Sequence, residues 1–153
     1  MNLESDVTYS IKEYKYGKLA FINESDKSYF FKENSTYQEY INDEFKKNYR
    51  PKSNILDVGS NVGIFSVSFA NIAKDCTIHS FEAVKITREL LEVSKNLSQA
   101  DNIKIYDFGL SEKNCTSIIN IDPNRLGNSS ISQDFSNLGG AIKEEINLKK
   151  LDD

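Results

Sequence analysis

The feature that most constrains the fold is a short apolar segment that leads into closely spaced glycines. Residues Asn54–Val58 (NILDV) predict a buried strand, and Gly59, Asn61 and Gly63 follow at two-residue steps. Glycine lets a backbone turn sharply where a Cβ atom would clash, and asparagine tolerates left-handed backbone angles. The helix expected next begins with unpaired N–H groups that can point at a ligand. The segment therefore predicts a strand–turn–helix unit with a ligand above the turn.

Helices and strands are predicted to alternate along the following residues. Strands are expected at residues 77–81 and 103–107. Two amphipathic helices are expected, one with Val62, Phe65, Phe69 and Ile72 on a face and the other with Ile86, Leu90, Val93 and Leu97. This order indicates a parallel sheet with right-handed crossovers. We therefore predict an α/β fold with a Rossmann-like three-layer sheet.

The N-terminal part has a different pattern. Apolar residues within 14–21 and 29–31 predict short strands, with 23–27 (NESDK) as a polar turn between two of them. A helix is expected from Ser35, which forms a capping-box pattern with Gln38, and its predicted apolar face carries Tyr37, Tyr40, Ile41 and Phe45. We therefore divide the chain into residues 1–50, a hairpin and a helix, and residues 51–153, a Rossmann-like half domain.

The C-terminal part is predicted to hold strands at residues 116–121 and 145–151, separated by a polar segment at 127–140. That segment is rich in serine and glycine and is interpreted as a surface loop, with a lid over a ligand as the alternative.

Charge and composition limit the expected partners. The formal net charge of −4 and the scattered lysines and arginines argue against nucleic acid as the main partner, since phosphate binding needs a concentrated basic surface. No apolar run is long enough to span a membrane, and no secretory signal precedes the fold, so a cytoplasmic protein is expected. Cys76 and Cys115 are expected to be reduced thiols, and a single histidine excludes a multi-histidine metal site.

A second carboxylate defines the expected ligand. Glu82 follows the strand at residues 77–81 and lies roughly twenty residues after Gly63, the offset typical of a ribose-binding acid. A carboxylate at this position can accept hydrogen bonds from both ribose hydroxyls. The turn and Glu82 together therefore predict an adenosine-containing ligand.

The residue before the turn distinguishes between two such ligands. The spacing is G-x-N-x-G rather than the G-x-G-x-x-G of dinucleotide-binding folds, and Asp57 lies two residues before Gly59. A negative charge is unfavourable beside a pyrophosphate but suits the ammonium and sulfonium groups of S-adenosylmethionine. We therefore rank S-adenosylmethionine above a nicotinamide dinucleotide.

Four segments resemble the FkbM-type methyltransferases: Asp57-Val-Gly-Ser-Asn-Val-Gly63, Ser80-Phe-Glu-Ala83, Gly109-Leu-Ser-Glu112 and Leu151-Asp-Asp153. The resemblance implies a class I, S-adenosylmethionine-dependent enzyme that methylates sugar or natural-product hydroxyls, so the expected acceptor is a small molecule or a saccharide. It also implies cofactor-binding residues. Asp57, Gly59, Ser60, Asn61 and Gly63 would line the methionine and ribose side, Glu82 would hold the ribose, and Asp107 and Phe108 would lie near the adenine.

Two departures from the family affect the expected activity. Ala83 stands where the family usually has proline, and the D-x-E-G strand that follows the family's L-D-D segment is absent. Without that strand, residues 54–58 would form an exposed apolar edge, so we expect either an N-terminal portion of a longer enzyme or an edge covered by a second copy or a partner chain. The catalytic base is not identified, and His79 is interpreted as structural. A non-catalytic binding module and a nicotinamide-dependent oxidoreductase remain the alternatives.

Overall fold

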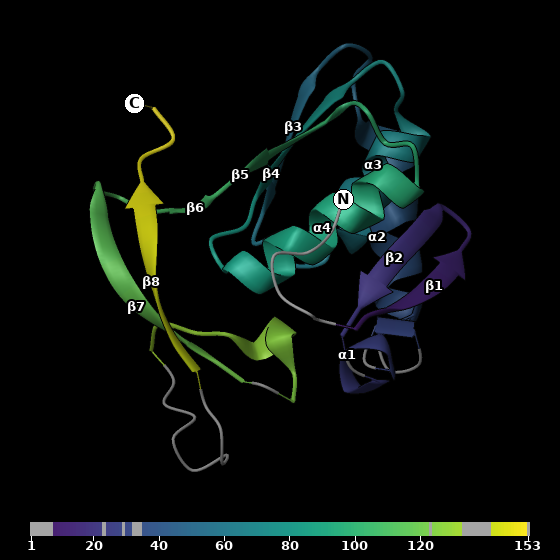
Figure 1. Cartoon of the computed structure of the whole chain (residues 1–153). Helices are drawn as coiled ribbons and strands as arrows, with labels where there is room; N and C mark the ends of the chain where they lie inside the picture. Colours follow the sequence, from purple (N-terminus) through teal and green to yellow (C-terminus); the bar gives the residue numbers. More distant parts are fainter. Residues whose placement is uncertain are drawn as a thin grey trace.

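A parallel three-stranded sheet forms the centre of the molecule (Figure 1). The computed structural model describes residues 8–22, 24–28, 30–31, 35–122, 124–132 and 142–152. The sheet has the order β3-β4-β5, with β3 at Asn54–Val58, β4 at Thr77–Phe81 and β5 at Ile103–Tyr106. Helices α3 (Ile64–Ile72) and α4 (Lys85–Leu97) connect consecutive strands. This alternation confirms the α/β prediction, and β5 ends one residue earlier than expected.

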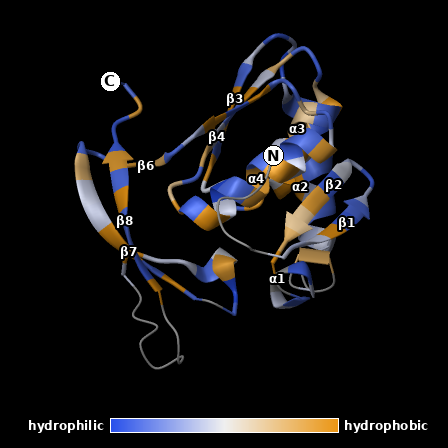
Figure 2. Ribbon diagram, in the orientation of Figure 1, coloured by the Kyte–Doolittle hydropathy of each residue, from blue (hydrophilic) through white to orange (hydrophobic). Residues whose placement is uncertain are grey.

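The hydrophobic core lies between one face of this sheet and the helices. Ile78 of β4, Val67 of α3 and Leu90 of α4 are completely buried. Figure 2 shows hydrophobic residues on β4 and α3, which contribute to this core. Burying such side chains supplies the main favourable free energy of folding. No helix among the described residues has the length and hydrophobicity that a transmembrane span requires.

The N-terminal hairpin is present, but its turn lies elsewhere than predicted. Strands β1 (Ser10–Tyr14) and β2 (Gly17–Phe21) pair antiparallel through a turn at residues 15–16. The predicted polar turn at 23–27 is wrong, because Glu24–Ser28 forms the short helix α1. Phe30 and Phe31 do not form a strand, and Tyr29 lies outside the described residues. The centroids of both phenylalanine rings lie within 6.0 Å of the Phe21 ring centroid, so the two rings pack against the core instead of belonging to a strand.

Strand β2 packs directly against α4. Its residues Leu19, Ala20 and Phe21 are completely buried in the main core. The backbone N–H of Ala20 donates to Ser94 Oγ at 3.0 Å. A helix hydroxyl therefore accepts the hydrogen bond of one backbone N–H in β2. The hairpin therefore shares its core with the sheet, while the division of the chain at residue 50 stays a prediction.

Helix α2 (Ser35–Asn48) buries a different face from the one predicted. Tyr37 and Tyr40 are 57% and 60% exposed, whereas Gln38 and Asn42 are buried. The Phe45 ring stacks on Phe69 of α3 with centroids 4.0 Å apart, and this contact sets the rotation of the helix. The apolar-face prediction is therefore right for Phe45 and wrong for the two tyrosines.

A second, mixed sheet holds the C-terminal strands. Its order is β6-β8-β7, with β6 at Phe108–Leu110, β7 at Cys115–Ile121 and β8 at Ile142–Lys149. Strand β6 was not foreseen, because three residues are too few for a periodic pattern. Within the predicted loop at 127–140, Gly127 lies in the 3₁₀ helix η2 (Leu126–Asn128), and residues 133–141 are outside the described ranges.

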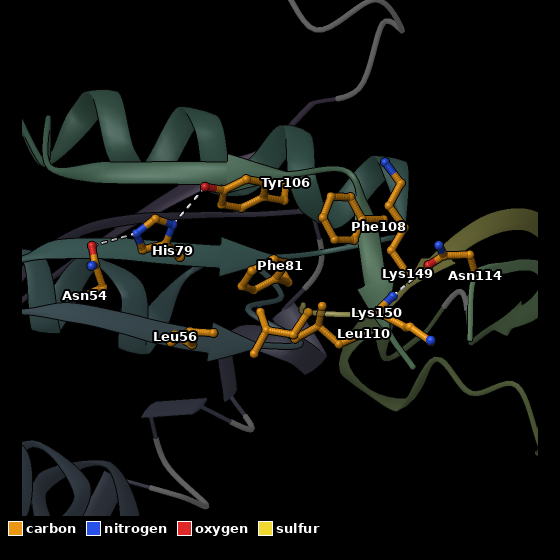
Figure 3. A pocket seen from close by; sticks show the side chains of 11 residues that line it. Asn54, Leu56, His79, Phe81, Tyr106, Phe108, Leu110, Asn114, Lys149 and Lys150 are labelled. Atoms are coloured by element: carbon orange, nitrogen blue, oxygen red, sulfur yellow. Dashed lines mark hydrogen bonds between the residues drawn. The ribbon is translucent and has the colours of Figure 1, made fainter. Parts of the chain in front are cut away.

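The sheet face opposite the helices is partly open (Figure 3). Leu56 and Val58 of β3 are 45% and 57% exposed, and β3 is the edge strand of its sheet within the described residues. A cavity of about 620 Å³ lies over this face and is lined by Leu56, His79, Phe81 and Tyr106, among others. Strand alternation places all four side chains on the same side.

Candidate cofactor site

The glycine turn between β3 and α3 adopts the backbone conformation that its sequence predicts. Gly59, Asn61 and Gly63 have φ angles of 76°, 50° and 93°, all in the left-handed region. The N–H groups of Gly59 and Ser60 donate to the Phe81 carbonyl at 2.9 and 3.1 Å. The turn is therefore bonded to the end of β4, next to Glu82.

Gly63 is required by helix packing. A Cβ atom added there would lie 2.3 Å from Leu91 Cδ1 of α4, and Leu91 is completely buried. The close neighbour of Gly63 is therefore α4, the helix that follows β4. The expectation that Gly63 also lines the cofactor stays a prediction.

Glu82 joins the turn to the sheet. Its Oε2 atom accepts the Asn61 N–H at 2.8 Å, and its Oε1 atom accepts the Val84 N–H at 2.9 Å. The side chain is 8% exposed. This burial raises the pKa of the carboxyl group above its ordinary value, and the two backbone donors offset part of that rise. The structure therefore brings Glu82 and the turn together, as the sequence predicted.

Asp57 points elsewhere. Its carboxylate accepts a hydrogen bond from Ser66 of α3, and the Ser66 hydroxyl lies 2.7 Å from Ser80 Oγ. Asp57 pairs with Ser80 in the sheet register, so strand alternation turns both side chains to the face that α3 covers. Burial raises the pKa of the Asp57 carboxyl, and the Ser66 hydrogen bonds lower it in part. The structure therefore does not bring Asp57 into the cavity that holds Glu82.

The raised pKa values of Asp57 and Glu82 predict how stability depends on pH. The folded chain holds these protons more tightly than the unfolded chain. The contribution of these two groups to the free energy of unfolding is therefore fully present below their ordinary values of 3.8 and 4.5 and is lost as pH rises through the raised pKa values. Asp57→Asn should flatten this fall. Urea unfolding from about pH 4 to 7 measures it, and an unchanged slope in the variant would contradict the prediction.

Glu82 lines a cavity of about 310 Å³, here named the carboxylate cavity. Its lining includes Gly59, Asn61 and Gly127, together with Ile119, Ile146 and Leu148 of the second sheet. A Cβ atom added at Gly59 would meet nothing within 4 Å, so the turn leaves room for a ligand to approach its backbone. A buried carboxylate beside an open backbone turn fits the ribose of an adenosyl ligand.

A second cavity of about 430 Å³, here named the aromatic groove, lies against the same turn. Phe30, Tyr37, Gln38 and Phe65 line it together with Ser60 and Ile64, and it shares Gly59, Asn61 and Gly127 with the carboxylate cavity. Sequence reasoning missed Tyr37 and Gln38 as site residues. The sequence placed Gln38 in a capping-box pattern, which predicts a cap at the start of the helix. In the structure its Nε2 atom instead donates to the Phe30 carbonyl at 2.5 Å.

Asp107 and Phe108 do not line the carboxylate cavity that holds Glu82. Asp107 occupies the bend between β5 and β6 and lines a separate pocket with Arg88 and Glu92. The Phe108 ring packs 5.5 Å from Phe81 on the open face, with Lys149 Nζ 4.4 Å above it. Figure 3 shows Phe108 beside that face. Their predicted place near the adenine stays a prediction.

His79 is held by two neighbours on the open face. Its Nδ1 atom lies 2.8 Å from Tyr106 Oη and its Nε2 atom 3.0 Å from Asn54 Oδ1, as Figure 3 shows. Burial lowers the pKa of the imidazole, with Lys104 adding to the effect. His79 therefore bonds across β3, β4 and β5 and does not line either cavity at the turn. Within the described ranges, no three histidine, cysteine or acidic side chains form a cluster that could hold a metal ion.

Known proteins share this fold. The chain is 28% identical over 120 residues to the methyltransferase sdnD of Sordaria araneosa, an alignment that covers 65% of this chain and 46% of that protein. The structure superposes on an S-adenosylmethionine-dependent methyltransferase from Agrobacterium tumefaciens with a TM-score of 0.51 at 14% identity, over 68% of this chain and 33% of the other. The fold is that of the class I methyltransferases. No protein-family profile matches the chain.

The chain spans less than half the length of this curated relative and a third of the solved structure. A complex of aTrm5 with tRNALeu has the same fold, with a TM-score of 0.50 at 20% identity over 71% of this chain and 33% of that chain. This neighbour contradicts the expectation that excluded nucleic acid. Net charge averages over a whole surface, whereas phosphate contacts need only a local group of basic residues, so the value of −4 does not support the exclusion.

Proposed function

We propose that this chain is the cofactor-binding part of an S-adenosylmethionine-dependent methyltransferase of the FkbM type, which transfers the methyl group to a hydroxyl of a sugar or natural product. The observation that carries the proposal is the hydrogen bond from the Asn61 N–H to Glu82 Oε2, which joins the glycine turn to an acid at the end of β4. Turn and acid open into one cavity at the carboxyl ends of parallel strands, where this class of sheet binds ligands.

Each part of the site has a distinct task. Glu82 accepts hydrogen bonds from the ribose hydroxyls, and its buried position fixes the direction of its oxygens. Gly59 lets the ligand approach the turn, and Ile146 and Leu148 keep water from that side. When bound, S-adenosylmethionine supplies an electrophilic methyl group on a sulfonium. The chain then accelerates transfer mainly by holding donor and acceptor in line.

The structure changes the argument against a nicotinamide ligand. Asp57 was expected to repel a pyrophosphate at the turn, but its carboxylate is bonded to Ser66 under α3. The choice of S-adenosylmethionine over a nicotinamide dinucleotide therefore depends on the fold that the chain shares with known methyltransferases and on the curated relative. A non-catalytic module would bind the same cofactor and transfer nothing.

Calorimetry and methyl transfer test the proposal. We expect saturable heat with S-adenosylmethionine and none with NAD, and transfer of a radiolabelled methyl group to neutral glycosides. Unmodified tRNA is the second acceptor to offer, because a solved neighbour of this fold is bound to tRNA. Binding of NAD without S-adenosylmethionine would overturn the cofactor assignment. Labelling of tRNA alone would overturn the hydroxyl acceptor, and binding without any transfer would indicate a binding module.

A further inference from the structure

The aromatic groove joins the N-terminal segment to the glycine turn. Tyr37 and Gln38 come from the first turns of α2, Phe65 from the first turn of α3, and Ser60 from the glycine turn itself. The groove and the carboxylate cavity share Gly59, Asn61 and Gly127. A ligand held at Glu82 and extending along the turn therefore reaches the wall of the groove.

The walls of the groove are aromatic and neutral. The Tyr37 ring meets Phe65 edge to face, with centroids 6.3 Å apart and planes at 84°. Tyr37 is 57% exposed, so much of its ring is available to a ligand. No lysine, arginine, aspartate or glutamate is among the described residues that line the groove. Aromatic faces with a few polar groups suit a neutral, ring-shaped compound.

The groove is preformed by contacts outside it. Helix α2 is fixed on α3 by the stack of Phe45 on Phe69, whose centroids are 4.0 Å apart. The Gln38 side chain holds the start of the helix through its hydrogen bond to Phe30. Tyr37 is thereby held beside the turn, and its exposed ring forms part of the wall of the groove.

We propose that the aromatic groove is the acceptor subsite, and that Tyr37 and Phe65 select a neutral, ring-shaped hydroxyl compound. This inference rests on the proposed function. An acceptor oxygen in the groove forms the O–CH₃ bond while the S–CH₃ bond breaks and leaves its electron pair on sulfur. The hydroxyl proton passes to solvent water.

Tyr40 provides a matched control for Tyr37. It lies on the same helix, is 60% exposed and does not line the groove, so both tyrosines can be replaced at a similar small cost in stability. The probe is p-nitrophenyl β-D-glucopyranoside, titrated into the chain saturated with S-adenosylhomocysteine. Tyr37→Ala should weaken probe binding about tenfold, as expected for the loss of a stacked ring, and Tyr40→Ala should not change it.

A parallel titration with S-adenosylmethionine separates the two proposals. If the wild-type chain does not bind S-adenosylmethionine, the proposed function fails. If it binds S-adenosylmethionine but not the probe, or if Tyr37→Ala weakens probe binding no more than Tyr40→Ala, the acceptor subsite is overturned. Phe65→Leu keeps an apolar side chain in the wall and removes the ring, so it should also weaken binding of the probe. Tyr37→Ala and Phe65→Leu should both retain the wild-type affinity for S-adenosylmethionine.

Discussion

Replacing Glu82 with alanine will weaken S-adenosylmethionine binding by about 1–3 kcal/mol, or roughly 5- to 150-fold in Kd, the effect of losing a charge-assisted hydrogen bond. Glu82 is the only acidic side chain among the described residues that line the carboxylate cavity. No other carboxylate there can replace it as an acceptor for the ribose hydroxyls. Isothermal titration calorimetry measures the change.

The same substitution has a structural cost that the experiment must separate from binding. Alanine leaves the N–H groups of Asn61 and Val84 without the carboxylate that accepts them. Glu82→Gln keeps the size and one acceptor oxygen but removes the charge, and we expect it to lose affinity with a smaller loss of stability. Glu112→Gln removes an exposed charge far along the chain and serves as the control. Unchanged affinity in both Glu82 variants, measured below their unfolding temperatures, would remove Glu82 from the site.

Gly63→Ala will destabilise the fold by about 2–4 kcal/mol, because overpacking and a left-handed backbone angle act together. The new Cβ atom would lie 2.3 Å from Leu91 Cδ1, so the completely buried Leu91 side chain would have to shift within the core. The φ angle of 93° adds strain for any residue with a side chain. Urea unfolding at neutral pH measures the loss.

Gly59→Ala is the matched comparison at the other end of the turn. Its φ angle is also positive, at 76°, but its Cβ atom would meet no protein atom within 4 Å. We expect a loss of about 1 kcal/mol in stability from the backbone alone, together with weaker binding of S-adenosylmethionine, because the methyl group enters the space that the ligand needs. Equal destabilisation in the two variants would show that backbone strain alone explains the glycines. An unchanged affinity in Gly59→Ala would place the ligand away from the turn.

The central strands and helices were predictable because their signals are local. The apolar runs of β3 and β4 and the helical spacing of Leu90 and Val93 lie within single segments. The left-handed turn was predictable for the same reason, because glycine and asparagine each tolerate positive φ angles whatever their distant neighbours are. The position of Glu82 was predictable because the residue directly follows a strand, and the carboxyl ends of parallel strands meet where such sheets bind ligands.

The N-terminal hairpin and α2 were predicted less well because distant contacts decide them. Phe30 and Phe31 have the composition of a strand, but their rings pack on Phe21, which lies outside their own segment. Tyr37 and Tyr40 resemble core residues of a helix, but the stack of Phe45 on Phe69 rotates α2 and exposes both. Apolar residues at helical spacing indicate that one face of a helix is buried. They do not indicate which element that face packs against.

The sequence by itself determined the parallel sheet, the glycine turn and the acid that follows the second strand, because each depends on residues close together in the chain. Only the tertiary structure decided that Asp57 turns under α3, that Gly63 packs on Leu91 and that α2 brings Tyr37 over the turn. These three outcomes depend on which elements pack together, and residues far apart in the chain settle that packing jointly.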